Sequence, residues 1–401
     1  MRSSANGVSK TGMRERNLSA LLAAIHYHPG NSRVQLAARL GLSNTTISAL
    51  VEELMDRGLV ESNGAGERVG AGRPSALLWP TTQRVALVVN PEIDVVTMAL
   101  VSMGGRIVDK VSIPNRGSRA FTVSKMVKLA TRYLAEASER TNRHAEVAML
   151  AVPGAGDAQL ETVIAAPSLR WKNVKAGAAL GEVIGMPVVT VNNARAATVG
   201  EWAFGALRDH HSGICIFSGT GGIGGGLLIN DAVVAGTGGL AGEIGKMRID
   251  DADLGRSNLS LEQLIQRDAV VAELGYTSLN DEELRSAMLD AIAKRKLAVV
   301  AEQSRVLANA IASLRDLLDP EVIVLGGYLG SILEVTGGSL LRAINVGAMV
   351  PRADGFLVSR SIGQVDMVLL GAAEAHWVQV LRDPLSSKLT RRRRNPSRGG
   401  A

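Results

Sequence analysis

Hydrophobic residues recur at helical spacing in the first sixty positions of the chain. A first stripe consists of Leu18, Leu21, Leu22 and Ile25, and the following Pro29 and Gly30 would end that helix. The next segment, SRVQLAARLGLSNTTISALVEELMDRG, predicts two short helices with Ser32 and Ser43 as N-caps and Gly41 in the turn between them. Its second helix carries a stripe of Ile47, Leu50, Val51 and Leu54. This arrangement predicts a helix-turn-helix.

A hairpin is predicted directly after these helices. The strand-like stretches LVES and SALLWP flank a glycine-rich centre that carries Arg68 and Arg73. Glycine and serine richness alone would also fit a flexible linker. The flanking strands favour a wing, so residues 1–80 are expected to form a winged helix-turn-helix domain.

Small polar residues occupy the start of the second predicted helix, where a recognition helix meets base edges in the major groove. They are Ser43, Asn44, Thr45, Thr46 and Ser48. Arg68 and Arg73 of the wing would reach phosphate or a minor groove. We therefore predict binding to a double-stranded DNA operator; the alternative is a purely structural three-helix unit.

The pattern changes from Arg84 onward. RVALVVN, VVTMALVSMGG and RIVDKVSI read as three strands, AFTVSKMVKLATRYLAEASERT as a helix, and VAMLAVPG as a buried strand. Similar strand and helix patterns recur in MPVVTVNNARAATVGEWAFGA and GICIFSGTGGIGGGLLIN. The fold class expected for the body is therefore α/β, in two lobes.

Composition narrows this picture. The 401 residues include a single cysteine, Cys215, which excludes an intramolecular disulfide and is expected to be a small buried hydrophobe. Apolar segments reach only about ten residues, short of the ~20 needed to span a membrane, and the polar N-terminus lacks a signal-peptide core, so a cytoplasmic protein is expected. The net charge of +6 is concentrated at the ends, and the tail from residue 388 is predicted to be disordered and basic.

Six motifs in order give the body a more specific interpretation. They are VPG, APSLRW, NNARAATVGEWAFGA, SGTGGIGGGLLI, GLAGEIGKMRID and DPEVIVLGG, between residues 152 and 327. In this order they resemble the ROK family, which comprises repressors and sugar kinases. The resemblance implies an actin-like (ribonuclease H-type) body with a sugar in the cleft and, in the kinases, ATP beside it. It implies a small lobe at 81–192 plus 367–387 and a large lobe at 193–366.

Two motifs depart from the kinase pattern. The family's phosphate loop D-x-G-G-T reads NPEID here, so that Glu92 and Ile93 occupy the glycine positions and crowd or repel phosphate. The family's N-D-A motif, whose aspartate acts as general base, reads Asn192-Asn193-Ala194. A carboxamide accepts no proton at neutral pH, although it still forms hydrogen bonds. We therefore expect no catalytic residues and no enzyme.

The zinc module of the family is also missing from the sequence. Lys246 stands where the resemblance implies a histidine, and GRSNLSLEQL contains no cysteine, so neither a structural zinc nor another cofactor is expected. The turn SGTGGIGGG keeps its glycines, for which packing of a hairpin is a better explanation than phosphate binding.

The remaining polar set would line a cleft for a sugar or a sugar-derived effector. Its members are Gly154, Asn192, Asn193, Glu243, Lys246 and Glu262. Amides and carboxylates that pair with vicinal hydroxyls give such sites their specificity. Two interpretations of Lys246 are open: a salt bridge to Glu243, three residues away, or attraction of an anionic ligand.

These features predict a transcriptional regulator, in the sense of a repressor of sugar-related genes, with a catalytically silent effector domain. It would act as a homodimer or a dimer of dimers, and lobe closure on the effector would change the operator affinity. The alternatives are an active sugar kinase and a regulator that responds to a protein partner without a small-molecule effector.

Overall fold

The protein divides into two compact units. The computed structural model describes residues 10–65, 76–115, 121–157, 162–251, 256–294, 297–347, 349, 357–363 and 365–386. The first unit, the DNA-binding unit, comprises Met1–Arg84, Ser102–Arg106 and Ala375–Ala401, and the second, the body, comprises Val85–Val101 and Ile107–Glu374. No helix of the described residues is long and apolar enough to cross a membrane.

Among its described residues, the N-terminal segment of the DNA-binding unit contains three helices and a small antiparallel sheet. The helices are α1 (Lys10–Tyr27), α2 (Arg33–Leu40) and α3 (Asn44–Asp56). The strands β1 (Asn31–Ser32), β2 (Val60–Ala65) and β3 (Ala76–Pro80) pair in the order β1-β3-β2. Strands β2 and β3 are the two sides of the predicted wing, and the glycine-rich centre between them lies outside the described residues.

Local signals explain where these helices begin and end. Ser32 forms a capping box with Gln35, and Gly41 ends α2 in the left-handed conformation that glycine adopts without strain. Ser43 caps α3 by accepting a hydrogen bond from the amide of Thr46. The predicted stripes are confirmed: Leu18, Leu21, Leu22, Ile25, Ile47, Leu50, Val51 and Leu54 are all buried.

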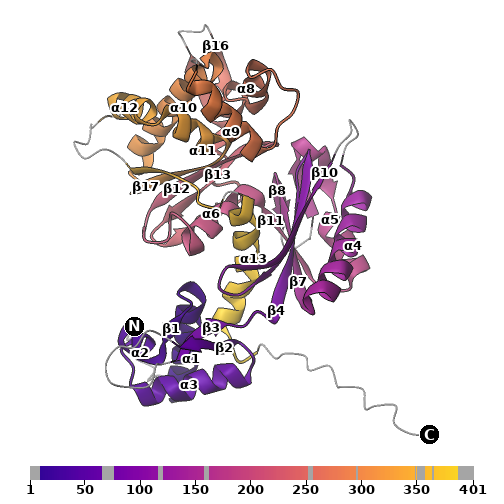
Figure 1. The fold of residues 1–401 in the computed structure, drawn as a ribbon, viewed down its shortest axis with the longest axis vertical. Coiled ribbons are helices and arrows are strands. Elements are labelled where there is room, and N and C mark those ends of the chain that lie inside the picture. Colours follow the sequence, from indigo (N-terminus) through magenta and orange to yellow (C-terminus); the bar gives the residue numbers. More distant parts are fainter. Residues whose placement is uncertain are drawn as a thin grey trace, which may run out of the picture. The chain divides into compact units, whose positions relative to one another are not determined.

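The first half of the body is built on a five-stranded sheet in the order β11-β7-β4-β5-β6. Its strands are β4 (Arg84–Pro91), β5 (Val95–Ser102), β6 (Arg106–Pro114), β7 (His144–Val152) and β11 (Val188–Asn192). Helices α4 (Val123–Thr141) and α5 (Ala176–Ile184) cover one face of this sheet (Figure 1). Beside it, β8 (Ala155–Asp157), β9 (Thr162–Ala166) and β10 (Trp171–Val174) form a smaller antiparallel sheet.

The second half of the body has its own five-stranded sheet, in the order β14-β13-β12-β17-β18. The strands are β12 (Gly213–Gly219), β13 (Gly222–Ile229), β14 (Ala232–Val233), β17 (Val322–Gly327) and β18 (Leu357–Arg360). The helices that accompany it are α6 (Asn193–Phe204), α7 (Leu261–Leu264), α8 (Arg267–Glu273), α9 (Asp281–Ile292), α10 (Ala298–Leu318), α11 (Tyr328–Thr336), α12 (Gly338–Gly347) and α13 (Val365–Arg382). A hairpin of β15 (Arg248–Asp251) and β16 (Arg256–Ser260) leads into α7.

Glycines let α6 approach its neighbours closely. A Cβ at Gly224 of β13 would lie 2.6 Å from the Ala194 side chain, and one at Gly371 of α13 would lie 1.8 Å from the Ala196 carbonyl oxygen. In the motif SGTGGIGGG, Gly224, Gly225 and Gly226 are closely packed in the β12–β13 hairpin, which supports the packing explanation for these three glycines. Cys215 is fully buried in β12, which confirms its expected role as a core residue.

Candidate functional site

The start of α3 combines a rigid cap with accessible polar side chains. The Ser43 Oγ accepts the Thr46 amide at 3.1 Å and lies 2.8 Å from the Thr46 Oγ1. Asn44 and Thr45 are exposed, and within the described residues their side chains form no hydrogen bond. Of the five residues of α3 and its cap that are predicted to contact DNA, Ser43 and Thr46 thus fix the helix start, Asn44 and Thr45 are exposed, and Ser48 is half-buried. Their contacts with DNA stay predictions.

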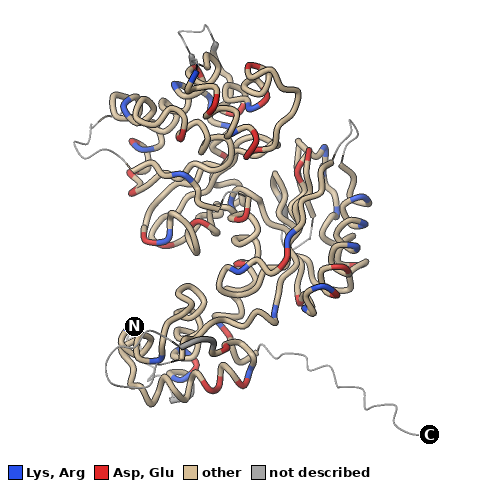
Figure 2. Tube along the Cα trace, viewed as in Figure 1, with Lys and Arg blue, Asp and Glu red and all other residues tan. Residues whose placement is uncertain are grey.

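Charge distinguishes the two ends of α3. Figure 2 shows acidic residues along this helix, and all of them, Glu52, Glu53 and Asp56, belong to its C-terminal half. Carboxylates there would repel phosphate, whereas the free amides of the first turn attract it. The helix is therefore suited to enter DNA with its N-terminal end.

Three predicted features fall outside the described residues. Arg68 and Arg73 lie in the centre of the wing, and the basic tail begins beyond the last described residue, Ser386. The DNA-binding role of these two arginines stays a prediction.

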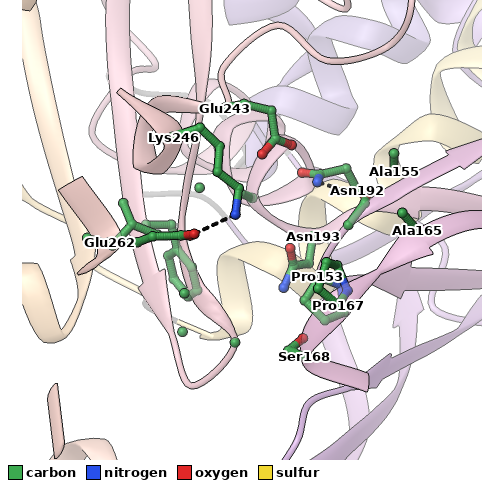
Figure 3. Close-up of a pocket in the computed structure, with 18 of the residues that line it drawn as sticks. Pro153, Ala155, Ala165, Pro167, Ser168, Asn192, Asn193, Glu243, Lys246 and Glu262 are labelled. Atoms are coloured by element: carbon green, nitrogen blue, oxygen red, sulfur yellow. Dashed lines mark hydrogen bonds and ion pairs between the residues drawn. The ribbon is translucent and has the colours of Figure 1, made fainter. Parts of the chain in front are cut away.

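The body contains a cavity of about 500 Å³ that polar side chains line together with apolar ones. Figure 3 shows Asn192, Asn193, Glu243, Lys246, Glu262 and Ser168 around it. All six residues predicted to bind the effector line this cavity: Gly154, Asn192, Asn193, Glu243, Lys246 and Glu262. The residues that the sequence groups as an effector site therefore lie together around one cavity of the structure.

Asn192 is a structural brace of this cavity. Its Oδ1 accepts the Arg195 amide at 2.8 Å, which makes it the N-cap of α6, and its Nδ2 donates to the Gly154 carbonyl oxygen at 2.9 Å. Both polar ends of the side chain are thus engaged within the protein. Gly154 itself is required by close packing, because a Cβ there would lie 2.1 Å from the Ala165 carbonyl oxygen.

Asn193 is paired with a carboxyl group. Its Nδ2 donates to the Glu92 Oε1 at 2.8 Å, and both residues are only 7% exposed. The pairing uses one of the two N–H donors of the amide and leaves its Oδ1 for another partner. Glu92 thus lies in the cavity beside the position where the resemblance places a catalytic aspartate.

Burial, together with the negative charge of Asp94, raises the pKa of Glu92 to about 7 despite the hydrogen bond from Asn193. The Thr220 hydroxyl donates to the Asp94 Oδ1 at 2.8 Å and lies 3.4 Å from the Glu92 Oε2. These contacts join the turn after β4 to the turn between β12 and β13.

Lys246 forms an ion pair with Glu262, with 2.5 Å between its Nζ and the Glu262 Oε1. The expected pairing with Glu243 is wrong. Residues 244–246 form a single 3₁₀ turn that Glu243 precedes, so these two side chains do not share an α-helical face. Among the described residues, no group of three or more His, Cys, Asp or Glu could hold a metal ion.

Ser168 was not selected from the sequence, although it lies in the motif APSLRW. Its Oγ is buried in the wall of the cavity and has no hydrogen-bond partner among the described residues. An unpaired buried hydroxyl costs stability unless a ligand or water satisfies it. Its motif, at the end of a strand, was the available signal.

The fold and the site define a class of protein: a winged helix-turn-helix unit followed by an actin-like α/β body. Residues 14–61 match winged helix-turn-helix DNA-binding domains, and residues 93–372 match the ROK family. The chain belongs to the ROK family, and it is a DNA-binding transcriptional regulator.

The relatives include regulators and kinases. The chain is 26% identical to the xylose repressor of Bacillus subtilis (strain 168) over 242 residues, which span 60% of this chain and 62%, less than two thirds, of that repressor. It is 29% identical to the glucokinase of Streptomyces coelicolor over 269 residues, which span 60% of this chain and 84% of that enzyme. A solved ROK family transcriptional regulator, a homolog of the E. coli MLC protein, matches with a TM-score of 0.68 and 21% identity over 93% of this chain and 98% of that chain. This match shows the fold.

Proposed function

We propose that the protein is a repressor of sugar-related genes whose body binds a carbohydrate without converting it. The observation that carries the proposal is the pair formed by Asn193 and Glu92. The Asn193 amide stands where the family resemblance implies a general base. It donates a hydrogen bond to Glu92, a buried residue at a position where the resemblance implies a phosphate-binding glycine. Such a cavity can hold a polyol through hydrogen bonds, and the aspartate that the family resemblance implies as general base is replaced in it by Asn193.

The effector would bind between the hydrogen-bonding groups of the cavity wall. Free groups are the Ser168 hydroxyl and the Asn193 Oδ1, and Glu243 and Glu262 add carboxylates. Asn192 and Gly154 would support the site from behind. Polar groups in this number give specificity, because a missing ligand hydroxyl leaves one of them unpaired.

Binding would be transmitted to DNA by a shift between two arrangements of the lobes at 81–192 with 367–387 and 193–366. The effect on operator affinity can be no larger than the preference of the effector for one arrangement. A homodimer in the cytoplasm, with one winged helix for each operator half-site, fits this scheme.

The test uses purified full-length protein and its own promoter DNA, with D-xylose and D-glucose as probes because the relatives are named for these sugars. We expect at least one of the sugars to change DNA affinity by about fivefold or more, as is usual for allosteric effectors. We expect no phosphorylation of either sugar in the presence of ATP and magnesium. Sugar-dependent ATP consumption that is lost in Asn193→Ala would instead support the kinase.

A regulator that responds to a protein partner makes a different prediction. Neither sugar, nor any other in a broad panel, would shift the thermal unfolding temperature, since a ligand that binds the folded state must stabilise it. The cavity with its unpaired Ser168 hydroxyl favours the small-molecule effector.

A further inference from the structure

Glu92 is a buried side chain with unused hydrogen-bonding capacity. It is 7% exposed and lines the cavity. An ionised carboxylate offers about four acceptor positions. The Asn193 amide occupies one of them at 2.8 Å, and the Thr220 hydroxyl, which bonds Asp94 at 2.8 Å, is 3.4 Å from the other oxygen. A donor that enters the cavity would therefore find an acceptor.

The charges of the cavity favour an uncharged donor over an anion. Its wall carries the carboxylates of Glu92, Glu243 and Glu262, and its lysine, Lys246, is tied to Glu262 at 2.5 Å. An anion that enters must give up its hydration close to these carboxylates, which is costly in a partly buried site. A hydroxyl carries no such penalty.

We propose that Glu92 is a specificity-determining residue of the effector site: its carboxyl group accepts a hydrogen bond from a hydroxyl of an unphosphorylated sugar and excludes sugar phosphates. The inference rests on the proposed function and adds to it the class of effector. It also resolves the role of Lys246, which neutralises Glu262 and does not recruit an anion.

The same contact couples sugar binding to a proton. The groups that face Glu92 are Asp94 in its own turn, Asn193 of α6, Thr220 of the β12–β13 turn and Asp281 of α9, which is paired with Arg267 of α8 at 3.0 Å. Burial, together with the carboxylates of Asp94 and Asp281, raises the pKa of Glu92 to about 7. The free protein is therefore partly protonated at neutral pH, and a hydroxyl that donates to the ionised form displaces the proton.

Isothermal titration calorimetry of the full chain tests this coupling with D-xylose and D-glucose. From a free pKa of about 7, binding should be about tenfold tighter at pH 8 than at pH 6. At pH 7, titrations in two buffers of different ionisation enthalpy should reveal release of about half a proton per sugar bound. These measurements need no variant, and a flat pH profile without proton release would overturn the proposal.

The matched variants are Glu92→Gln and Glu182→Gln. Glutamine keeps the shape of residue 92 and can still accept from Asn193, whereas Glu182 is an exposed residue of α5. In Glu92→Gln the pH slope should disappear, and the preference for D-glucose over D-glucose 6-phosphate at pH 8 should shrink about tenfold. Glu182→Gln should keep both properties.

Two failures can be told apart. If the wild-type protein binds D-xylose or D-glucose and Glu92→Gln leaves both slope and preference unchanged, the role of Glu92 is overturned and the sugar-sensing function stands. If no sugar binds at either pH, both are overturned.

Discussion

The start of α3 and the cavity of the body both carry polar side chains, but they use them in opposite ways. At the start of α3, the hydrogen bonds are local, between Ser43 and Thr46, and the neighbouring Asn44 and Thr45 are exposed. At the cavity, the hydrogen bonds join distant positions, Glu92 to Asn193 at a separation of 101 residues and Asp94 to Thr220 at 126, and the Glu92 carboxyl group is buried. The polar side chains of Asn44 and Thr45 are thus exposed, whereas those of Glu92 and Asn193 already have a partner within the protein.

This difference has an energetic meaning. Asn44 and Thr45 are exposed and share no hydrogen bond, so their substitutions should be less strongly coupled in DNA binding than substitutions within one hydrogen-bond network. Residues of one hydrogen-bond network do not contribute additively, so the effects of changing Glu92 and Asn193 should be coupled. Substitutions in the two regions can therefore distinguish exposed side chains from members of a buried network.

The largest effect is expected for Gly371→Ala, which attacks the support of the cavity. The new Cβ would lie 1.8 Å from the Ala196 carbonyl oxygen of α6, the helix that begins with Asn193, so the helices must move apart. Overpacking of this severity costs about 3 kcal/mol or more of the free energy of unfolding. Thermal or urea unfolding measures it. In the control Gly238→Ala the new Cβ has no atom within 4 Å, so its free energy of unfolding should stay close to that of the wild type. If Gly371→Ala lowers the free energy of unfolding as little as this control does, the packing of α6 is adaptable.

A pH-dependent effect is expected for Glu92→Gln. The folded protein binds the Glu92 proton more tightly than the unfolded chain, because the pKa is raised from 4.5 to about 7. The stability that Glu92 confers on the wild type, relative to the Glu92→Gln variant, is therefore present at low pH and is lost as the pH rises from 4.5 to about 7. The difference in free energy of unfolding between variant and wild type should change by up to about 3 kcal/mol across this window, in favour of the variant at high pH. Urea unfolding at several pH values checks it, and parallel curves would refute the raised pKa.

The smallest effect, and the one that separates recognition from support, compares Asn44→Ala with Ser43→Ala. Loss of the Ser43 cap should lower the stability of the DNA-binding unit by about 1 kcal/mol and weaken DNA binding indirectly. Asn44→Ala should leave stability unchanged and cost about 1–3 kcal/mol of operator affinity if the side chain reads a base. Unfolding curves and DNA titrations at one salt concentration measure both. A stability loss in Asn44→Ala without a loss of operator affinity would reverse the assignment.

The same contrast explains what the sequence could predict. The helix-turn-helix was predictable because its signals are local: Ser32 and Ser43 as caps, Gly41 at the turn and a buried stripe on α3. The membership of the cavity was predictable from the order of the family motifs. The partners of its residues were not, since Lys246 pairs with Glu262 and not with Glu243 because the β15–β16 hairpin between them brings Glu262, 16 residues along the chain, next to Lys246. Nor did the motif NNA reveal that Asn192 is a cap with both polar ends occupied.

The bonds from the turn after β4 to Asn193 and Thr220 also bear on how the protein folds. Each closes a loop of more than a hundred residues. The bond to Asn193 needs β4 and β11 of one five-stranded sheet, and the contact with Thr220 also needs β12 and β13 of the second sheet. The cavity should therefore be among the last parts of the body to assemble and be absent from the transition state for folding. A bound sugar would then slow unfolding and leave the folding rate nearly unchanged. The effector would therefore prolong the lifetime of the folded regulator in addition to changing its affinity for DNA.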